Sequence, residues 1–272
     1  MHTRTLALVG ATGGAGTTRT AVELAALGAR DGRDVAVVDA AFTTQGLSEH
    51  VSGRIGTDLT TLVTDETGAS LSAATYPIAV GGGNVGGAGS AGTGDGADAP
   101  DLPGRADAIP ARAPFERVAR AKTAEAARKL ERRIDEAATS YDAVIVDAAP
   151  VGSNEAVAGV TAADRTAAVF PATTHGRDAR QRLRGRIADV GAGMDRSIAV
   201  ARGGDGEGDE EGAESGADVR LPPTESAVAS APTAATGDGE YVRAVAAAFE
   251  DAFDATVGIE FEDPGLVDRL TP

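Results

Sequence analysis

A glycine-rich segment near the start of the sequence has the residue types and the spacing of a phosphate-binding loop. It runs from Gly10 to Thr18 and follows the apolar run Leu6–Val9. A complete loop of this kind reads G-x-x-x-x-G-K-[ST]: backbone amides surround the phosphates, the lysine reaches the β- and γ-phosphates, and the hydroxyl holds Mg²⁺. Gly16 and Thr18 match this pattern, but Thr17 occupies the lysine position. The residues that we expect to line the phosphate site are Gly10, Thr12, Gly13, Gly14, Ala15, Gly16, Thr17 and Thr18.

Two later apolar runs are strand-like and contain an aspartate at their end. The first lies within Asp34–Phe42, and the second, Tyr141–Pro150, reads Y-D-A-V-I-V-D-A-A-P. Together with the glycine loop, and in this order, they resemble the ParA/MinD family of P-loop ATPases, with its K-G-G-x-G-K-T-T loop, V-D-x-D strand end and Y-D-x-I-I-I-D-x-P-P strand. Residues 161–171 resemble the A-A-D strand of that family, and residues 220–228 resemble its late I-P-x-x-x-x-V segment. The resemblance covers most of the chain.

The resemblance implies ATP and Mg²⁺ as ligands. Thr18, Asp39 and Asp147 match the hydroxyl and the acids that organise Mg²⁺ in the family. A plainer interpretation remains open, because glycine-rich turns between a strand and a helix also occur for steric reasons alone. Asp39 and Asp147 could likewise cap helices, and Thr18 could serve only to satisfy backbone amides at a helix start.

Other positions of the family pattern are lost. Thr12 stands at the signature lysine that reaches a nucleotide across the dimer interface, and Thr17 stands at the second lysine of the loop. Ala41 replaces the acid that orients the attacking water, so no catalytic residue is expected. The family's adenine-reading Asn is missing near Ala201-Arg202, and Arg19, the nearest cation to the loop, would have to fold back to reach it.

These losses favour a protein that binds nucleotide weakly, or not at all, and does not hydrolyse it. Phosphoryl transfer depends on positioning and on neutralising charge, which the missing cations would have supplied. We therefore expect a degenerate ParA/MinD-like protein, a pseudo-ATPase that acts as a regulator or scaffold in intracellular positioning, segregation or signalling. The alternative is an active Mg-ATP-dependent ATPase that uses Arg19 or a partner's arginine as a substitute cation.

The amino-acid composition limits the chemistry that the protein can perform and indicates its cellular environment. The 272 residues carry a formal net charge of −16 and contain no cysteine, which excludes disulfides and thiolate chemistry. His2, His50 and His175 are scattered and do not suggest a zinc site. Lys122 and Lys129 are the only lysines, and this acidic, lysine-poor composition resembles proteins of salt-loving archaea. With no apolar run long enough to span a bilayer, we expect a cytoplasmic protein.

Strand-like runs alternate with helical patterns, which predicts an α/β fold: a doubly wound, mostly parallel sheet with helices on both faces. The expected strands are Leu6–Val9, Val35–Val38, Ala143–Val146, Arg165–Phe170 and Ser197–Val200, with Tyr76–Val80 as a further candidate. The expected helices are Arg19–Arg30, Pro114–Thr139, Gly176–Val190 and Gly239–Ala255, with a short helix or turn at Thr57–Thr64.

Two segments, residues 81–104 and 203–216, are rich in glycine and small or acidic residues and read as disordered insertions. Because the strand pattern resumes after each, we expect one P-loop NTPase-like domain over residues 1–272.

Charge patterns bear on partners. Residues 105–133 and 176–186 are rich in arginine, which leaves nucleic-acid binding open, although we favour solvated helix faces with pairs such as Glu125–Lys129. The acids of the C-terminal helix, 240–255, argue against membrane docking. We expect a protein partner. Since Thr12 removes the lysine that crosses the dimer interface, the chain should be a monomer or an ATP-independent dimer.

Overall fold

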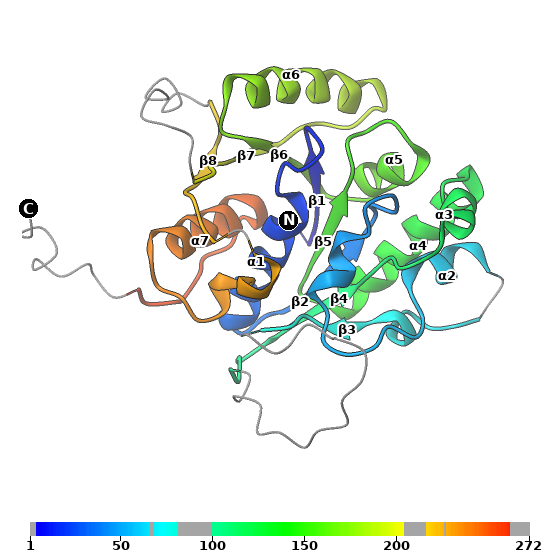
Figure 1. Ribbon diagram of the computed structural model, residues 1–272, viewed down its shortest axis with the longest axis horizontal. Coiled ribbons are helices and arrows are strands. Elements are labelled where there is room, and N and C mark those ends of the chain that lie inside the picture. Colours follow the sequence, from blue (N-terminus) through cyan, green and yellow to red (C-terminus); the bar gives the residue numbers. More distant parts are fainter. Residues whose placement is uncertain (1–3, 66–67, 81–99, 204–215, 226, 262–272) are drawn as a thin grey trace, which may run out of the picture.

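A computed structural model describes residues 4–65, 68–80, 100–203, 216–225 and 227–261. They form an eight-stranded sheet in the order β3-β4-β2-β5-β1-β6-β7-β8 (Figure 1). All neighbours pair in parallel except β3 and β4, so the predicted mostly parallel α/β sheet is confirmed. The strands are β1 Thr5–Gly10, β2 Asp34–Asp39, β3 Tyr76–Pro77, β4 Arg105–Ile109, β5 Ala143–Ala148, β6 Arg165–Pro171, β7 Arg196–Val200 and β8 Val219–Leu221.

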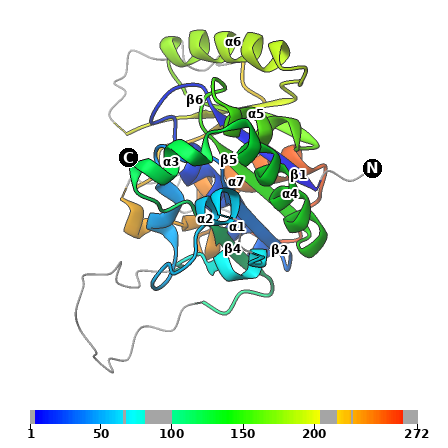
Figure 2. The same ribbon diagram turned by 90° about the vertical axis from the view of Figure 1, so that its right-hand side faces the viewer.

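Helices cover both faces of the sheet. They are α1 Thr17–Arg30, α2 Leu59–Thr64, α3 Phe115–Ala121, α4 Ala124–Ser140, α5 Asn154–Thr161, α6 Thr174–Asp189 and α7 Glu240–Phe253. Helices α1 and α7 share one hydrophobic core, and α2 to α6 contribute to the core on the opposite face. In Figure 2, α2, α3, α4 and α5 lie in front of the sheet and α7 lies behind it.

Strand β1 shows how the sequence builds both cores. Leu6 and Leu8 belong to the core under α1 and α7, whereas Ala7 and Val9 belong to the core on the other face. Successive strand residues point to opposite faces, and a parallel sheet covered on both sides needs apolar residues on each. The continuous apolar run before the glycine loop is therefore the signature of a central strand.

Several predicted elements differ from the structure. Strand β4 was not expected; it pairs with β2 where an expected insertion ends. Helix α5 was also missed, and the expected helix Pro114–Thr139 is two helices, α3 and α4. The break falls at Lys122 and Thr123, where the Thr123 hydroxyl accepts a hydrogen bond from Ala126 N at 3.3 Å and caps α4. The candidate strand Tyr76–Val80 shrinks to β3, with an isolated bridge at Ile78.

The single domain over residues 1–272 stays a prediction, because most of both expected insertions, 81–99 and 204–215, lies outside the described residues. Among the described residues, no helix combines the length and apolar character needed to cross a membrane.

Candidate phosphate-binding site

The glycine loop joins β1 to α1, and two of its residues have a backbone that only glycine adopts without strain. Gly14 has φ 68° and Gly16 has φ 90°. Gly16 is the N-cap of α1, and no side chain caps this helix. The loop is closed from within by Ala15 N, which donates to Thr12 O at 3.3 Å, and Ala15 is itself buried. The segment between β1 and α1 is therefore a tight turn whose backbone requires glycine at two positions.

The amides of this loop are available to a ligand. Within the part of the chain that the structure describes, the backbone N–H groups of Gly14, Gly16, Thr17 and Thr18 donate to no acceptor. The first N–H groups of a helix have no intrahelical partner, and together with the helix dipole they favour an anion. The loop thus offers several donors and a positive partial charge at one point.

Thr17, at the lysine position, faces the base of the loop. A Cβ added to Gly10 would lie 2.7 Å from Thr17 Oγ1, so the hydroxyl packs against the glycine that ends β1. A threonine side chain is short and neutral, and it brings no positive charge to the cradle. The open side of the loop is formed by Gly13, whose added Cβ would meet no atom within 4 Å.

Thr18 and Asp147 are brought together by the fold. Thr18 Oγ1 donates a hydrogen bond to Asp147 Oδ2 at 2.6 Å, from the first turn of α1 to the end of β5. Burial raises the pKa of Asp147 above its ordinary value, and the bond from Thr18 opposes that rise. A hydroxyl beside a carboxylate is a donor set that suits Mg²⁺, since hard cations prefer oxygen ligands.

Asp39 lies next to Asp147 but is differently engaged. The two residues are paired in register between β2 and β5. Asp39 is fully buried, and its two oxygens accept hydrogen bonds from Ala41 N at 3.0 Å and Ala111 N at 3.2 Å. Burial, and then repulsion from Asp147, raises the pKa of Asp39. Asp39 therefore fits Mg²⁺ less well than Asp147, because its oxygens already bind backbone amides.

Neither aspartate caps a helix in the described part of the chain, so that alternative does not hold for either. No group of three or more acidic or histidine side chains among the described residues is arranged to hold a metal ion. Any Mg²⁺ would depend on Thr18, Asp147 and the phosphates themselves.

The turn after β2 contains Ala41 in place of the expected acid. Thr44 N and Gln45 N both donate to Ala41 O, at 2.9 and 3.0 Å. The Gln45 side chain makes two further bonds with the backbone of Ala113, at 2.9 and 2.8 Å. The turn ends at Gly46, where an added Cβ would lie 3.3 Å from Thr18 Oγ1. This places the turn directly against the loop's hydroxyl.

Arg19 does not fold back towards the loop. Its Nε lies 2.6 Å from Glu23 Oε1, and its other nitrogens bond Glu225 O at 3.1 Å and Thr233 Oγ1 at 3.0 Å. Buried Glu23 also accepts hydrogen bonds from the backbone of Thr233 and Ala234. Arg19 thus fastens the late segment of the chain to α1, and its side chain is not placed to act as the substitute cation that the active-ATPase alternative would require of it.

Arg202 contacts the loop, and sequence reasoning did not assign it this position. Its guanidinium donates to the carbonyl of Gly14. The two residues are 188 positions apart, so no local pattern could reveal the contact.

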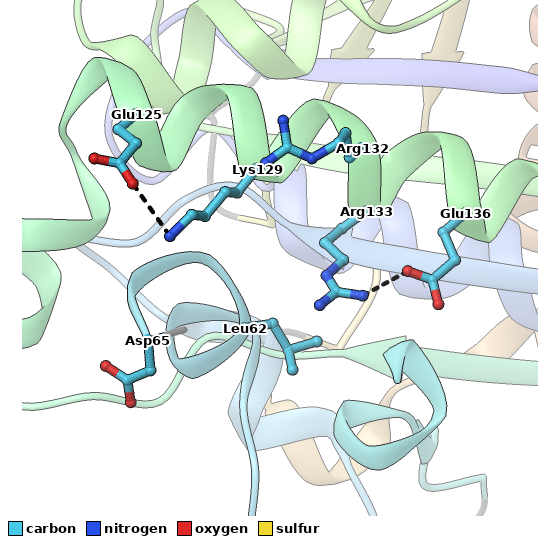
Figure 3. Close-up of a pocket in the computed structure, with 7 residues that line it drawn as sticks. All are labelled: Leu62, Asp65, Glu125, Lys129, Arg132, Arg133 and Glu136. Carbon is cyan, nitrogen blue, oxygen red and sulfur yellow. Dashed lines mark hydrogen bonds and ion pairs between the residues drawn. The ribbon is translucent and has the colours of Figure 1, made fainter. Parts of the chain in front are cut away.

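A cavity of about 480 Å³ lies elsewhere, between α2 and α4 (Figure 3). Its charged side chains largely pair with one another: Lys129 Nζ lies 3.3 Å from Glu125 Oε1, and Arg133 lies 2.6 Å from Glu136 Oε2. The expected Glu125–Lys129 pair is therefore confirmed. None of the lining residues belongs to the glycine loop or to the strand ends around it.

Comparison with known proteins gives matches in structure alone. No family model matches the sequence, and no curated protein matches it. MinD from Pyrococcus horikoshii, solved with Mg-ADP, is 19% identical, with a TM-score of 0.61 over 81% of this chain and 82% of that chain. An ATP complex of a McdA variant from Cyanothece is 17% identical, with a TM-score of 0.62 over 96% of this chain and 99% of that chain.

An enzyme with another activity is also similar. Cobyrinic acid a,c-diamide synthase from Mycobacterium smegmatis, solved with ADP and magnesium, is 17% identical, with a TM-score of 0.60 over 84% of this chain and 89% of that chain. At such identities a shared fold does not transfer an activity. The eight-stranded sheet, its helices and these neighbours show that the chain has the α/β fold of the ParA/MinD-type P-loop ATPases.

Proposed function

We propose that this chain is a ParA/MinD-like nucleotide-binding protein that binds Mg-ATP weakly and does not hydrolyse it. It acts as a regulator or scaffold in intracellular positioning, segregation or signalling, in the cytoplasm of a salt-adapted cell. The observation that carries the proposal is a contrast within one loop. The N–H groups of Gly14, Gly16, Thr17 and Thr18 have no acceptor among the described residues, while threonines stand at both lysine positions, 12 and 17.

Binding is supported by the loop and by the residues around it. Free amides at the start of α1 provide an anion site, and Thr18 with Asp147 provides oxygen ligands for Mg²⁺. When bound, Mg²⁺ neutralises charge on the outer phosphates. Each missing charge-assisted hydrogen bond removes about 1.5–3 kcal/mol, which corresponds to roughly ten- to a hundredfold in affinity. We therefore expect dissociation constants far weaker than those of a complete loop.

The absence of hydrolysis follows from the turn after β2. Ala41 has no group that can orient or deprotonate water, and its backbone is engaged in the turn itself. Stabilisation of transferring phosphoryl groups by positively charged side chains is the main protein contribution to this chemistry, and neither Thr12 nor Thr17 supplies it.

The alternative, an active ATPase with a substitute cation, is favoured by one observation. Arg202 contacts the loop at Gly14, whereas Arg19 is engaged with Glu23. An arginine at the rim of the loop, or one supplied by a partner, could neutralise phosphate charge in place of a lysine.

One set of assays separates the two functions. Purified full-length protein in molar KCl is titrated with ATP, with and without Mg²⁺, and phosphate release is followed over many hours. We expect weak, Mg²⁺-dependent binding and no turnover. The Asp147→Ala variant serves as the control, because it should lose the Mg²⁺ dependence. Sustained turnover that disappears in Asp147→Ala would establish the active ATPase instead.

A further inference from the structure

Lys122, one of two lysines in the chain, is held at the end of α3 by contacts to two other parts of the fold. Its Nζ lies 2.7 Å from Thr43 Oγ1 and 3.3 Å from Glu155 Oε1. The backbone is fixed as well, because Asn154 Nδ2 donates to Lys122 O at 2.8 Å. Two residues at the start of α5 therefore hold Lys122, one at its backbone carbonyl and the other at its ammonium group.

Glu155 gives the arrangement its rigidity. The carboxylate is 1% exposed, and its second oxygen, Oε2, has no hydrogen-bond partner in the described structure. A buried carboxylate that loses its counter-charge is strongly unfavourable, so the ion pair with Glu155 holds the ammonium of Lys122 in place. An ammonium has three donors. Thr43 and Glu155 account for two of them, and the side chain of Lys122 is about one third exposed.

The position of Lys122 relates it to the glycine loop. Thr43, its partner, lies in the turn that ends at Gly46, and Gly46 packs against Thr18. Helix α5, which carries Glu155, follows β5, and β5 carries Asp147. The ammonium therefore lies beyond the carboxyl ends of β2 and β5, the edge of the sheet at which Thr18 and Asp147 meet. Ligands of open α/β sheets bind at this edge.

We propose that Lys122 binds the terminal phosphate of a nucleoside triphosphate held on the glycine loop, with Glu155 as its positioning residue. This inference rests on the proposed function, since it needs a nucleotide on the loop. The loop amides would hold the inner phosphates, and Lys122 would donate its third hydrogen to the terminal phosphate. Because Lys122 and Glu155 are together neutral, the contribution is directional and specific to the terminal phosphate; it does not attract anions in general.

The test compares ATP with ADP in matched variants. The single substitution Lys122→Gln would leave Glu155 buried and unpaired, so the double variant K122Q/E155Q removes both charges together. The control is K129Q/E125Q, because Lys129 and Glu125 form the other lysine–glutamate pair at the same 3.3 Å separation, away from the loop. Calorimetric titration of the full-length proteins with Mg-ATP and Mg-ADP gives the ratio of the two dissociation constants.

We expect the wild type and K129Q/E125Q to prefer ATP over ADP by about tenfold or more, the effect of one charge-assisted hydrogen bond. K122Q/E155Q should lose this preference while its affinity for ADP stays the same. Glu155→Gln alone should lower the preference for ATP in part. If Glu155 had a purely structural role, this substitution would instead weaken the binding of ATP and of ADP equally.

Other outcomes overturn the inference in distinguishable ways. If K122Q/E155Q keeps the preference for ATP, or if the wild type binds ATP and ADP equally, the proposed nucleotide binding is retained and the proposed role of Lys122 is rejected. If the wild type binds neither nucleotide, the proposed function fails together with the inference.

Discussion

The glycine loop and the turn after β2 meet at Thr18, and they differ in what their backbone groups are free to do. In the loop, the N–H groups of Gly14, Gly16 and Thr17 have no acceptor among the described residues. In the turn, the N–H groups of Ala41, Thr44 and Gln45 all bond to acceptors within the protein. The region that would bind phosphate is open, and the region that would serve the reaction is closed on itself.

The largest expected effect comes from restoring charge to the open region. Thr17→Lys should raise the affinity for Mg-ATP by about ten- to a hundredfold, because one charge-assisted hydrogen bond returns. Calorimetry or fluorescent-nucleotide titration measures it, with Thr17→Ala as the uncharged control. Hydrolysis should appear only when Ala41→Asp, and if needed Thr12→Lys, is added. An unchanged affinity in Thr17→Lys would mean that the loop no longer fits phosphate and that the two regions are equally closed.

A second effect separates loop shape from loop charge. Gly16→Ala forces an L side chain to φ 90°, and we expect it to lower the free energy of unfolding by about 1–2 kcal/mol and to abolish ATP binding. For stability, Gly13→Ala is the matched control, because its Cβ would meet open space and its φ is not in the left-handed region. Denaturant melts measure the stability of both variants, and ATP titration measures binding by Gly16→Ala. Equal losses of stability in the two variants would contradict a loop held by specific backbone angles.

A smaller, pH-dependent effect probes the closed region. His50 ends the short helix Gly46–His50 that follows the turn, and burial, with the charge of Arg19 second, lowers its pKa from 6.5 to about 4. His50 therefore binds a proton less readily in the folded protein than in the unfolded chain. The contribution of neutral His50 to the free energy of unfolding is fully present above pH 6.5 and is lost as pH falls towards 4. His50→Gln should reduce the fall in stability between pH 7 and pH 5 by about 1 kcal/mol.

Urea melts of both proteins at pH 7 and at pH 5 provide the measurement. If the free energy of unfolding fell by the same amount between pH 7 and pH 5 in the wild type and in His50→Gln, the lowered pKa of His50 would be contradicted.

The smallest expected effect is on association. In the dimer that the resemblance to the ParA/MinD family implies, Thr12 cannot make the contact to the partner's nucleotide that a lysine would make, so we expect no linkage between ATP binding and dimerisation. Light scattering at several protein concentrations, with and without millimolar Mg-ATP, should give the same mass: a monomer or a constitutive dimer. An ATP-induced shift from monomer to dimer would show that the site still switches, and the degenerate-regulator proposal would be abandoned.

Sequence reasoning predicted the parts of the molecule that depend on local pattern. The run Leu6–Val9, the glycines at positions 14 and 16, and acids at the ends of β2 and β5 all have local causes: burial on both faces, a left-handed backbone, and a strand end. Strand β4 escaped notice because its sequence, R-A-D-A-I, holds one large apolar residue. Helix α5 escaped because it is short and no side chain caps its start.

The contacts around the candidate site could not be predicted in the same way. Arg202 meets Gly14 across 188 residues and Lys122 meets Thr43 across 79, so only the packing of the sheet brings them together. The same holds for Arg19, whose partner Glu23 is local but whose other contacts lie more than 200 residues away. A sequence motif gives the type of residue at a site, whereas the orientation of long side chains depends on tertiary neighbours.

The order of strands has a consequence for synthesis. Strand β5 lies between β1 and β2, so the first two strands of the chain never pair with each other. A nascent chain that ends before Ala148 cannot complete this central part of the sheet, and the bond between Thr18 and Asp147 cannot form until then. Since long-range parallel pairing is slow, the bond that joins the glycine loop to β5 must wait for more than half of the protein to emerge.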